Sequence, residues 1–187
     1  MQATSQDIVD TLLAQHQQIK TLFAQVQSAT GEPKEELFHE LVALLAVHES
    51  VEESLVHPLA EDKLPDGGDV VPARLAEEQE AKEALAALYD LGVAHPEFDP
   101  RLAALRDAVT AHAEAEEAFE FIRLREVVDP DRLVTMASAM TAVAAMSPTR
   151  PHPGVPANPA ANLLLGPPLA VFDRVRDAVR DATRGAR

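Results

Sequence analysis

Apolar residues recur every three or four positions along most of the chain, which is the period of amphipathic helices. The expected helices cover residues 8–30, 33–57, 72–91 and 100–127, followed by a shorter helix from residue 130. Gly31 and Gly92 end the first and third of these helices. A proline begins each helix after the first: Pro33, Pro72, Pro100 and Pro130. No stretch alternates as a β-strand does. Short connections between four long helices predict an all-α, up-down four-helix bundle.

The pattern changes after residue 146. Prolines crowd residues 148–168, so this stretch is expected to be an extended arm. A last amphipathic helix then carries Leu169, Phe172, Val175 and Val179 on one face. We therefore divide the chain into a helical bundle with an extra helix (1–146) and a Pro-rich arm with a C-terminal helix (147–187). The arm is expected to pack on its own bundle or to mediate a homodimer, since so short a helix is marginal alone.

Composition narrows the class of partner. The chain has 31 acidic and 16 basic residues, a formal charge of −15, which excludes binding to nucleic acid or to an anionic membrane surface. Cysteine is absent, so thiolate metal sites and disulfides are excluded. The first 20 residues lack the basic and apolar regions of a signal peptide, and no stretch is apolar enough to span a membrane. The expected location is the cytoplasm.

Ionisable residues interrupt the apolar stripes of three predicted helices. His16 lies on the core-facing stripe of the first helix. The second helix carries His48 and Glu52 four residues apart on its stripe, and the fourth repeats this spacing with His112 and Glu116. Residues four apart share one helix face, so each pair can bind one ion or a bridged pair of ions.

Burying these groups is costly unless they are paired or bind a metal. One core histidine alone is usually a hydrogen-bonded core residue, but three histidines and two glutamates directed into one interior indicate a cation site. Each pair is followed by a second glutamate, Glu53 or Glu117. We expect these two to face solvent or to orient the imidazoles.

This arrangement resembles the hemerythrin-like (HHE cation-binding) family of bacterial proteins. The family pattern is a His in helix one, H-x-x-x-E in helix two, a His in helix three and H-x-x-x-E in helix four. Its match here covers His16, His48 with Glu52, and His112 with Glu116. The resemblance implies a non-haem centre of two iron ions with oxo or carboxylate bridges, with manganese as the second choice. It also implies a small oxidant or gas as the reacting partner.

The third helix departs from the family pattern. Matching its Glu-Ala-Lys sequence places Glu78 where the family has a histidine, and Gln79 takes that position if the register is off by one. His57-Pro58 replaces the aromatic-Pro pair that often ends helix two in the family. His57 is either an additional ligand or, as we expect, a solvent-facing residue at a helix end. His39, His95 and Tyr89 are expected to serve surface or packing roles.

The sequence therefore predicts six metal ligands: His16, His48, Glu52, Glu78, His112 and Glu116. The leading hypothesis is a di-iron protein that reacts with or senses O₂, peroxide or nitric oxide, with peroxide decomposition as a possible enzymatic activity. The alternatives are a metal-responsive interaction module, an iron-handling bundle without turnover, and a bundle whose site has degenerated. The carboxylate at position 78 favours redox chemistry or sensing over reversible O₂ carriage.

Overall fold

The computed structural model describes the backbone of residues 6–146 and the side chains of residues 6–140. Its elements are α1 (Ile8–Ser28), α2 (Glu32–Val51), η1 (Glu52–Val56), α3 (His57–Lys63), α4 (Gly67–Leu91), α5 (Phe98–Glu116), η2 (Glu117–Phe121), α6 (Ile122–Val127) and α7 (Pro130–Met146). No β-strand occurs within residues 6–146. The predicted all-α helical bundle is confirmed. The predicted arm and C-terminal helix lie outside the described residues, so the division at residue 146 stays a prediction.

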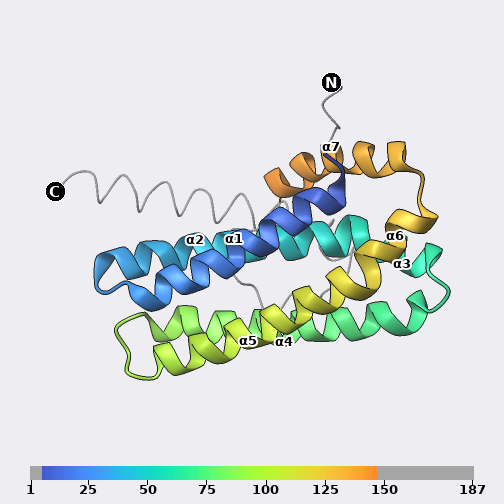
Figure 1. Cartoon of the computed structure of the whole chain (residues 1–187). Helices are drawn as coiled ribbons and strands as arrows, with labels where there is room; N and C mark the ends of the chain where they lie inside the picture. The colour runs from blue at the N-terminus through green and yellow to red at the C-terminus, as the bar shows by residue number, and fades with distance from the viewer. Residues whose placement is uncertain (1–5, 147–187) are drawn as a thin grey trace.

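The elements form four helical rods that run up and down, with α7 added at the end (Figure 1). The second rod is α2, η1 and α3 in succession, and the fourth is α5, η2 and α6. The rods associate in two pairs, because α1 packs along α2 and α4 packs along α5. Helix α7 packs against both α1 and α2. None of the helices in the described part of the chain is long and apolar enough to cross a membrane.

Both η1 and η2 are single π-helical turns, in which backbone hydrogen bonds span five residues. In η1 the His57 N–H donates to the Glu52 carbonyl. This wider turn explains why the second rod continues through Pro58 to Lys63, whereas the sequence predicted its end near His57. A π turn leaves room for a proline ring that would clash with the backbone of a regular helix.

The start of the third rod also differs from the sequence prediction. Helix α4 begins at Gly67, because Val70 N–H already donates to the Asp66 carbonyl at 3.0 Å. Pro72 therefore lies inside the helix and not at its first position. At the start of α1, the reciprocal hydrogen bonds of a capping box join Asp7 and Asp10.

Two apolar clusters fill the bundle, one at each end. The first contains residues such as Leu12, Val51, Val71 and Phe121, and the second residues such as Ile19, Leu45, Leu85 and Leu105. Along each rod the two clusters are separated by roughly two to three turns. That interval is occupied by the histidines and glutamates singled out from the sequence, which thus form a polar layer across the middle of the bundle.

Candidate metal centre

Four rods contribute to the polar layer. His16 comes from α1, His48 from α2 and Glu52 from the first position of η1. The remaining three predicted ligands are Glu78 of α4 and His112 and Glu116 of α5. Five of the six are at most 4% exposed, and the His112 side chain is 12% exposed. The structure thus gathers all six predicted residues into one buried layer.

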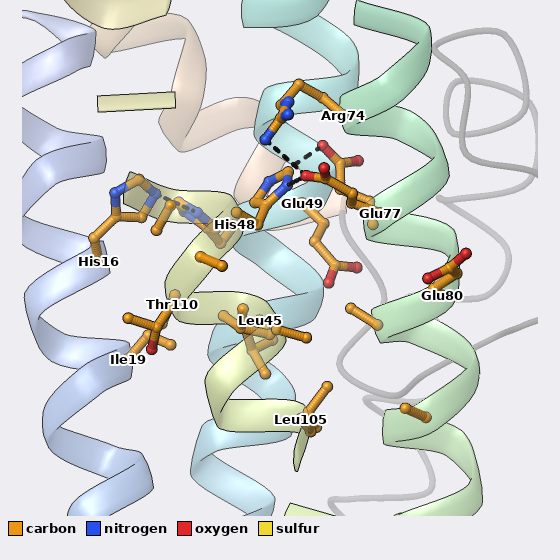
Figure 2. Close-up of a pocket in the computed structure, with 18 of the residues that line it drawn as sticks. His16, Ile19, Leu45, His48, Glu49, Arg74, Glu77, Glu80, Leu105 and Thr110 are labelled. Carbon is orange, nitrogen blue, oxygen red and sulfur yellow. Dashed lines mark hydrogen bonds and ion pairs between the residues drawn. The ribbon is translucent and has the colours of Figure 1, made fainter. Parts of the chain in front are cut away.

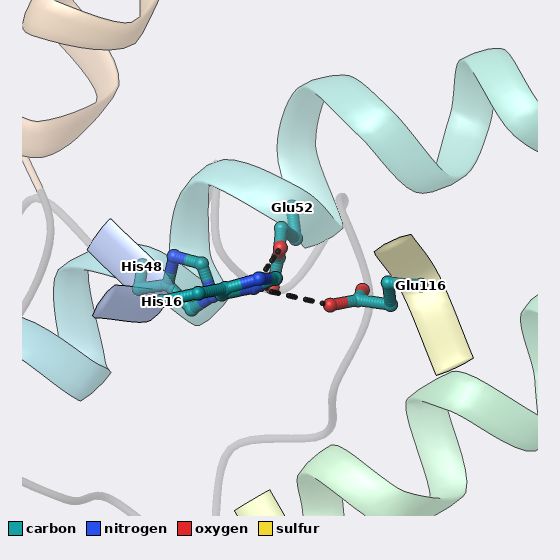
Figure 3. A group of neighbouring side chains, drawn as sticks. All are labelled: His16, His48, Glu52 and Glu116. Carbon is teal, nitrogen blue, oxygen red and sulfur yellow. Dashed lines mark hydrogen bonds and ion pairs between the residues drawn. The ribbon is translucent and has the colours of Figure 1, made fainter. Parts of the chain in front are cut away.

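One half of the layer is formed by His16, His48, Glu52 and Glu116, whose polar atoms point toward one another (Figure 3). The two histidine Nε2 atoms lie 3.1 Å apart, and His48 Nε2 lies 3.3 Å from Glu52 Oε2. His16 Nε2 lies 3.5 Å from Glu116 Oε2 and 3.8 Å from Glu52 Oε1. Ligand atoms that share one ion at about 2.1 Å lie roughly 3 to 4 Å apart. These separations match the edges of a coordination polyhedron.

The other half is formed by Glu52, Glu78, His112 and Glu116. His112 Nε2 lies 3.4 Å from Glu116 Oε1 and 3.9 Å from Glu78 Oε1. Glu52 and Glu116 belong to both halves. Glu116 directs Oε2 toward His16 and Oε1 toward His112, so one carboxylate faces both groups. That is the placement of a carboxylate bridge between two metal ions.

The atoms that face the middle of the layer lack hydrogen-bond partners in the described part of the molecule. Both carboxylate oxygens of Glu52, both of Glu116, and His112 Nε2 are buried and unpaired. Buried polar groups are nearly always hydrogen-bonded, because an unpaired one costs on the order of 1–3 kcal/mol. Five such atoms around one space fit a bound cation pair.

The outward ring nitrogens of the three histidines all have acceptors. His16 Nδ1 donates to Glu117 Oε1 at 2.8 Å, and His112 Nδ1 donates to Glu77 Oε2 at 2.9 Å. His48 Nδ1 donates to Gln15 Oε1 at 2.9 Å. Donation through Nδ1 leaves the Nε2 lone pair of each ring directed into the layer, which is how metal-ligating histidines are usually held. The predicted orienting role of Glu117 fits this geometry, whereas Gln15 and Glu77 were not anticipated.

Negative charge exceeds positive charge in and around the layer. The buried glutamates are Glu49, Glu52, Glu53, Glu78, Glu116 and Glu120. The basic side chains near them are Lys82, whose Nζ lies 3.2 Å from Glu53 Oε1, and Arg74, whose Nη1 lies 2.7 Å from Glu77 Oε2. The contact with Lys82 and the burial of Glu53 rule out the expectation that Glu53 faces solvent. The excess of carboxylate favours uptake of cations.

Burial and the neighbouring charged groups shift the pKa values of the residues in the polar layer. Burial and the neighbouring Glu116 raise the pKa of Glu52 to about 8. Burial lowers the pKa of His16, but the nearby carboxylates of Glu116 and Glu52 outweigh it and raise that pKa to about 10. Burial, reinforced by His16, lowers the pKa of His48 to about 3, so the His48 ring is neutral. Without metal, protons on Glu52 and His16 therefore balance part of the negative charge.

Comparison with known proteins assigns the chain to a family. The family model for the hemerythrin HHE cation binding domain matches residues 7–121. The chain belongs to this family. A similar solved structure is that of a hemerythrin HHE cation binding domain-containing protein from Mycobacterium kansasii, with a TM-score of 0.64 and 22% identity over 74% of this chain and 88% of that one. No curated protein matches the chain significantly.

Helix α4, the third rod of this hemerythrin-family chain, directs Glu78 into the layer. Glu78 is 2% exposed and lies among the candidate ligands. Gln79 points elsewhere, since its side-chain amide donates to Glu83 Oε1 at 2.9 Å on the outside of the bundle. The geometry thus favours Glu78 over Gln79 at the position where the family pattern has a histidine.

The largest differences from the sequence prediction follow from the π turns. His57, expected to face solvent, is 1% exposed, and its Nε2 lies 2.5 Å from Glu78 Oε1. Phe119, three residues after Glu116 and so on the same face of a regular helix, is 62% exposed, whereas Glu120 and Phe121 are buried. A π turn inserts one residue into the helical period, so positions after Glu52 and Glu116 are rotated relative to a regular helix. A Pro after His57 was the only local signal of such an irregularity.

The other residues noted in the sequence lie outside the polar layer. Tyr89 packs beside the second apolar cluster, with its ring 5.5 Å from that of the half-buried His39. His95 is exposed in the loop before α5. The packing role expected of Tyr89 is confirmed, and so is the surface position of His95.

A cavity lies beside the polar layer, between the helical rods. It has a volume of about 710 Å³ and is lined by His16, His48, Glu52, Glu78 and His112 at the layer. Arg74 and Glu77 lie at its polar end, and Leu45 and Leu105 line the apolar side (Figure 2). Several alanines of α4 and α5 form the rest of the wall, which leaves the space open. His112, with its side chain 12% exposed, is the most exposed of the candidate ligands that line this cavity.

Proposed function

We propose that this protein binds two iron ions in the polar layer and uses them to react with or sense a small oxidant. The single observation that carries the proposal is the placement of Glu52 and Glu116. Both are completely buried, both have unpaired oxygens, and both belong to the two groups of ligands. In this proposal His16 and His48 hold one ion, His112 and Glu78 hold the other, and the two glutamates bridge them.

The donor set favours iron. Three imidazoles with three carboxylates supply mixed nitrogen and oxygen ligands to two ions, which suits iron and, as second choice, manganese. Zinc has no redox chemistry of its own, so it would not support the proposed reaction with a small oxidant. Replacing a helix-three histidine with Glu78 adds negative charge and favours higher oxidation states of iron. This is why redox chemistry or sensing is proposed in preference to O₂ carriage.

A bound iron pair would supply an open coordination position and redox equivalents for O₂, peroxide or nitric oxide. The chain supplies the surroundings. Phe121 stacks on the His16 ring at 5.7 Å, and the apolar clusters close both ends of the layer to water. The cavity beside His112 provides the access that a small oxidant needs. The outward hydrogen bonds to Glu117, Gln15 and Glu77 keep the imidazoles oriented during reaction.

The reactivity is tested by adding each oxidant to anaerobically iron-loaded protein and recording the visible spectrum. We expect a ligand-to-iron charge-transfer band to form or shift within the mixing time with at least one of O₂, peroxide and nitric oxide. Repeated peroxide additions with evolution of O₂ would establish enzymatic turnover. A spectrum that none of the three changes would contradict the proposed reactivity and leave an iron-handling bundle.

Metal affinity is expected to increase with pH between about 6 and 8. Glu52, with its pKa raised to about 8, and His16, with its pKa raised to about 10, are protonated at pH 7 and must lose their protons to bind a cation. Calorimetric titration with Mn²⁺ in two buffers of different ionisation enthalpy measures this directly. We expect at least one proton to be released per protein at pH 7. An affinity independent of pH, with no proton release, would contradict the assignment of these two ligands.

A further inference from the structure

We propose that His57, Glu116 and Glu120 form a third divalent-cation position beside the iron pair. One nitrogen of His57 and one oxygen from each glutamate all lie within 4.8 Å of one another. The inference rests on the proposed function in one respect, because Glu116 belongs to both sites. The other two residues are not among the six ligands of the pair.

The distances within this group suit a shared ion better than a hydrogen bond. His57 Nδ1 lies 3.6 Å from Glu120 Oε2, which is beyond hydrogen-bond distance. Two ligands held at about 2.1 Å from one ion have this separation. All three residues are at most 1% exposed, so water from outside does not solvate the carboxylates.

The polar atoms of the group are also unpaired. His57 Nδ1 and both oxygens of Glu120 lack hydrogen-bond partners among the described residues. Arg74 Nε lies 3.9 Å from Glu120 Oε1, and the Nη1 atom of the same arginine lies closer to Glu77, 2.7 Å from its Oε2. A buried carboxylate whose basic neighbours, His57 and Arg74, lie 3.6 and 3.9 Å away is costly unless a cation compensates it.

Glu78 sets the state of the His57 ring. His57 Nε2 lies 2.5 Å from Glu78 Oε1, and a carboxylate can only accept there, so Nε2 carries the proton. In the neutral ring, Nδ1 then presents a lone pair to Glu120. The Nδ1 lone pair of His57 and the Glu120 carboxylate repel each other unless a metal ion binds between them or Nδ1 takes up a second proton. The experiment below distinguishes the two.

The two π turns bring these residues together. In each of η1 and η2 the extra residue follows a bridging glutamate, Glu52 or Glu116, and rotates the next turn of helix inward. His57 comes inward from the first and Glu120 from the second. Isolated π turns are rare and are found mostly at functional sites. Here the two π turns together place His57 and Glu120 beside the polar layer.

The group suits a divalent first-row ion such as Fe²⁺ or Mn²⁺, because it offers one imidazole and two carboxylates. It has three protein ligands, and one of them is shared with the pair. We therefore expect this position to bind more weakly than the pair and to fill after it.

The test is anaerobic equilibrium dialysis against increasing Fe²⁺, with bound iron determined by elemental analysis. The wild-type chain is expected to approach three ions at saturation. Glu120→Gln, which keeps the side-chain shape, is expected to bind the first two ions normally and to weaken the third at least about tenfold. Glu126→Gln, which alters an exposed glutamate on the next helix, is the matched control and should behave as wild type.

Each outcome separates this inference from the proposed function. Saturation of both wild type and Glu120→Gln at two ions would overturn the third position, leave the iron pair standing and assign a proton to His57. A wild type that binds no iron would overturn both proposals. Loss of all iron in a Glu120→Gln chain that melts as the control does would make Glu120 a ligand of the pair and overturn a separate third position. Should Glu120→Gln fail to fold, His57→Gln provides the same comparison.

Discussion

Replacing Glu116 with Ala is expected to abolish binding of every metal ion. Glu116 faces His16 with one oxygen and His112 with the other, so its loss opens both groups of ligands. By contrast, His48→Ala removes a ligand from one group alone and should leave the second ion bound. Loss of a shared ligand should lower affinity at least about a hundredfold at each position, which exceeds the effect of a residue outside the ligand set. Native mass spectrometry of iron-loaded protein counts the ions directly.

The control for this experiment is Glu114→Ala, which removes an exposed carboxylate from the same helix two residues earlier. It should retain the wild-type number of ions. If Glu116→Ala folds and keeps two ions, the bridge between the two groups does not exist. If it loses one ion and His48→Ala loses both, the roles assigned to the two residues are interchanged.

Removing the metal is expected to lower the melting temperature by on the order of 10 °C or more. A ligand present at a thousand times its dissociation constant stabilises the folded state by about 4 kcal/mol, and each kcal/mol corresponds to roughly 2–4 °C in a chain of this size. Without the cation, Glu52 and Glu116 face each other in a buried space with unpaired oxygens. Differential scanning calorimetry of chelated and iron-loaded protein measures the shift.

Glu52→Gln should change stability in opposite directions in these two states. In the iron-loaded protein it removes a bridging ligand and lowers the melting temperature. In the metal-free protein it removes a buried carboxyl whose pKa is raised to about 8 by burial and Glu116, and it should raise the melting temperature. Because the folded state holds this proton more tightly than the unfolded state, metal-free wild type loses stability as pH rises from about 4.5 to 8. The benefit of Glu52→Gln is therefore largest above pH 8.

This account is contradicted if Glu52→Gln destabilises the iron-loaded and the metal-free protein equally. Such a result would assign Glu52 a packing role unrelated to metal. The matched control is Glu114→Gln. Because this side chain is exposed, the substitution should change the free energy of unfolding of either state by no more than about 0.5 kcal/mol.

The helical period was sufficient to predict the fold and five residues of the polar layer, namely His16, His48, Glu52, His112 and Glu116. His16, for example, lies four positions after Leu12 and three before Ile19, so a regular helix brings it inward. Family resemblance added the register of the third helix, where the structure directs Glu78 and not Gln79 into the layer.

The residues that the sequence did not predict fall into two groups with different causes. His57, Glu120 and the exposed Phe119 follow π turns, and a pattern that assumes 3.6 residues per turn misplaces whatever comes after the extra residue. Gln15 and Glu77 contact histidines on other helices. Such contacts depend on how rods pack sideways, which hydrophobic periodicity along one helix does not specify.

The central claim is that the polar layer binds a metal pair, and the most direct test is native mass spectrometry of protein purified from cells grown with iron. The account predicts a mass increase of at least two iron ions per chain, lost on chelation and absent from Glu116→Ala. A folded wild-type chain that carries no metal, and that takes up none on anaerobic addition of Fe²⁺, would contradict it.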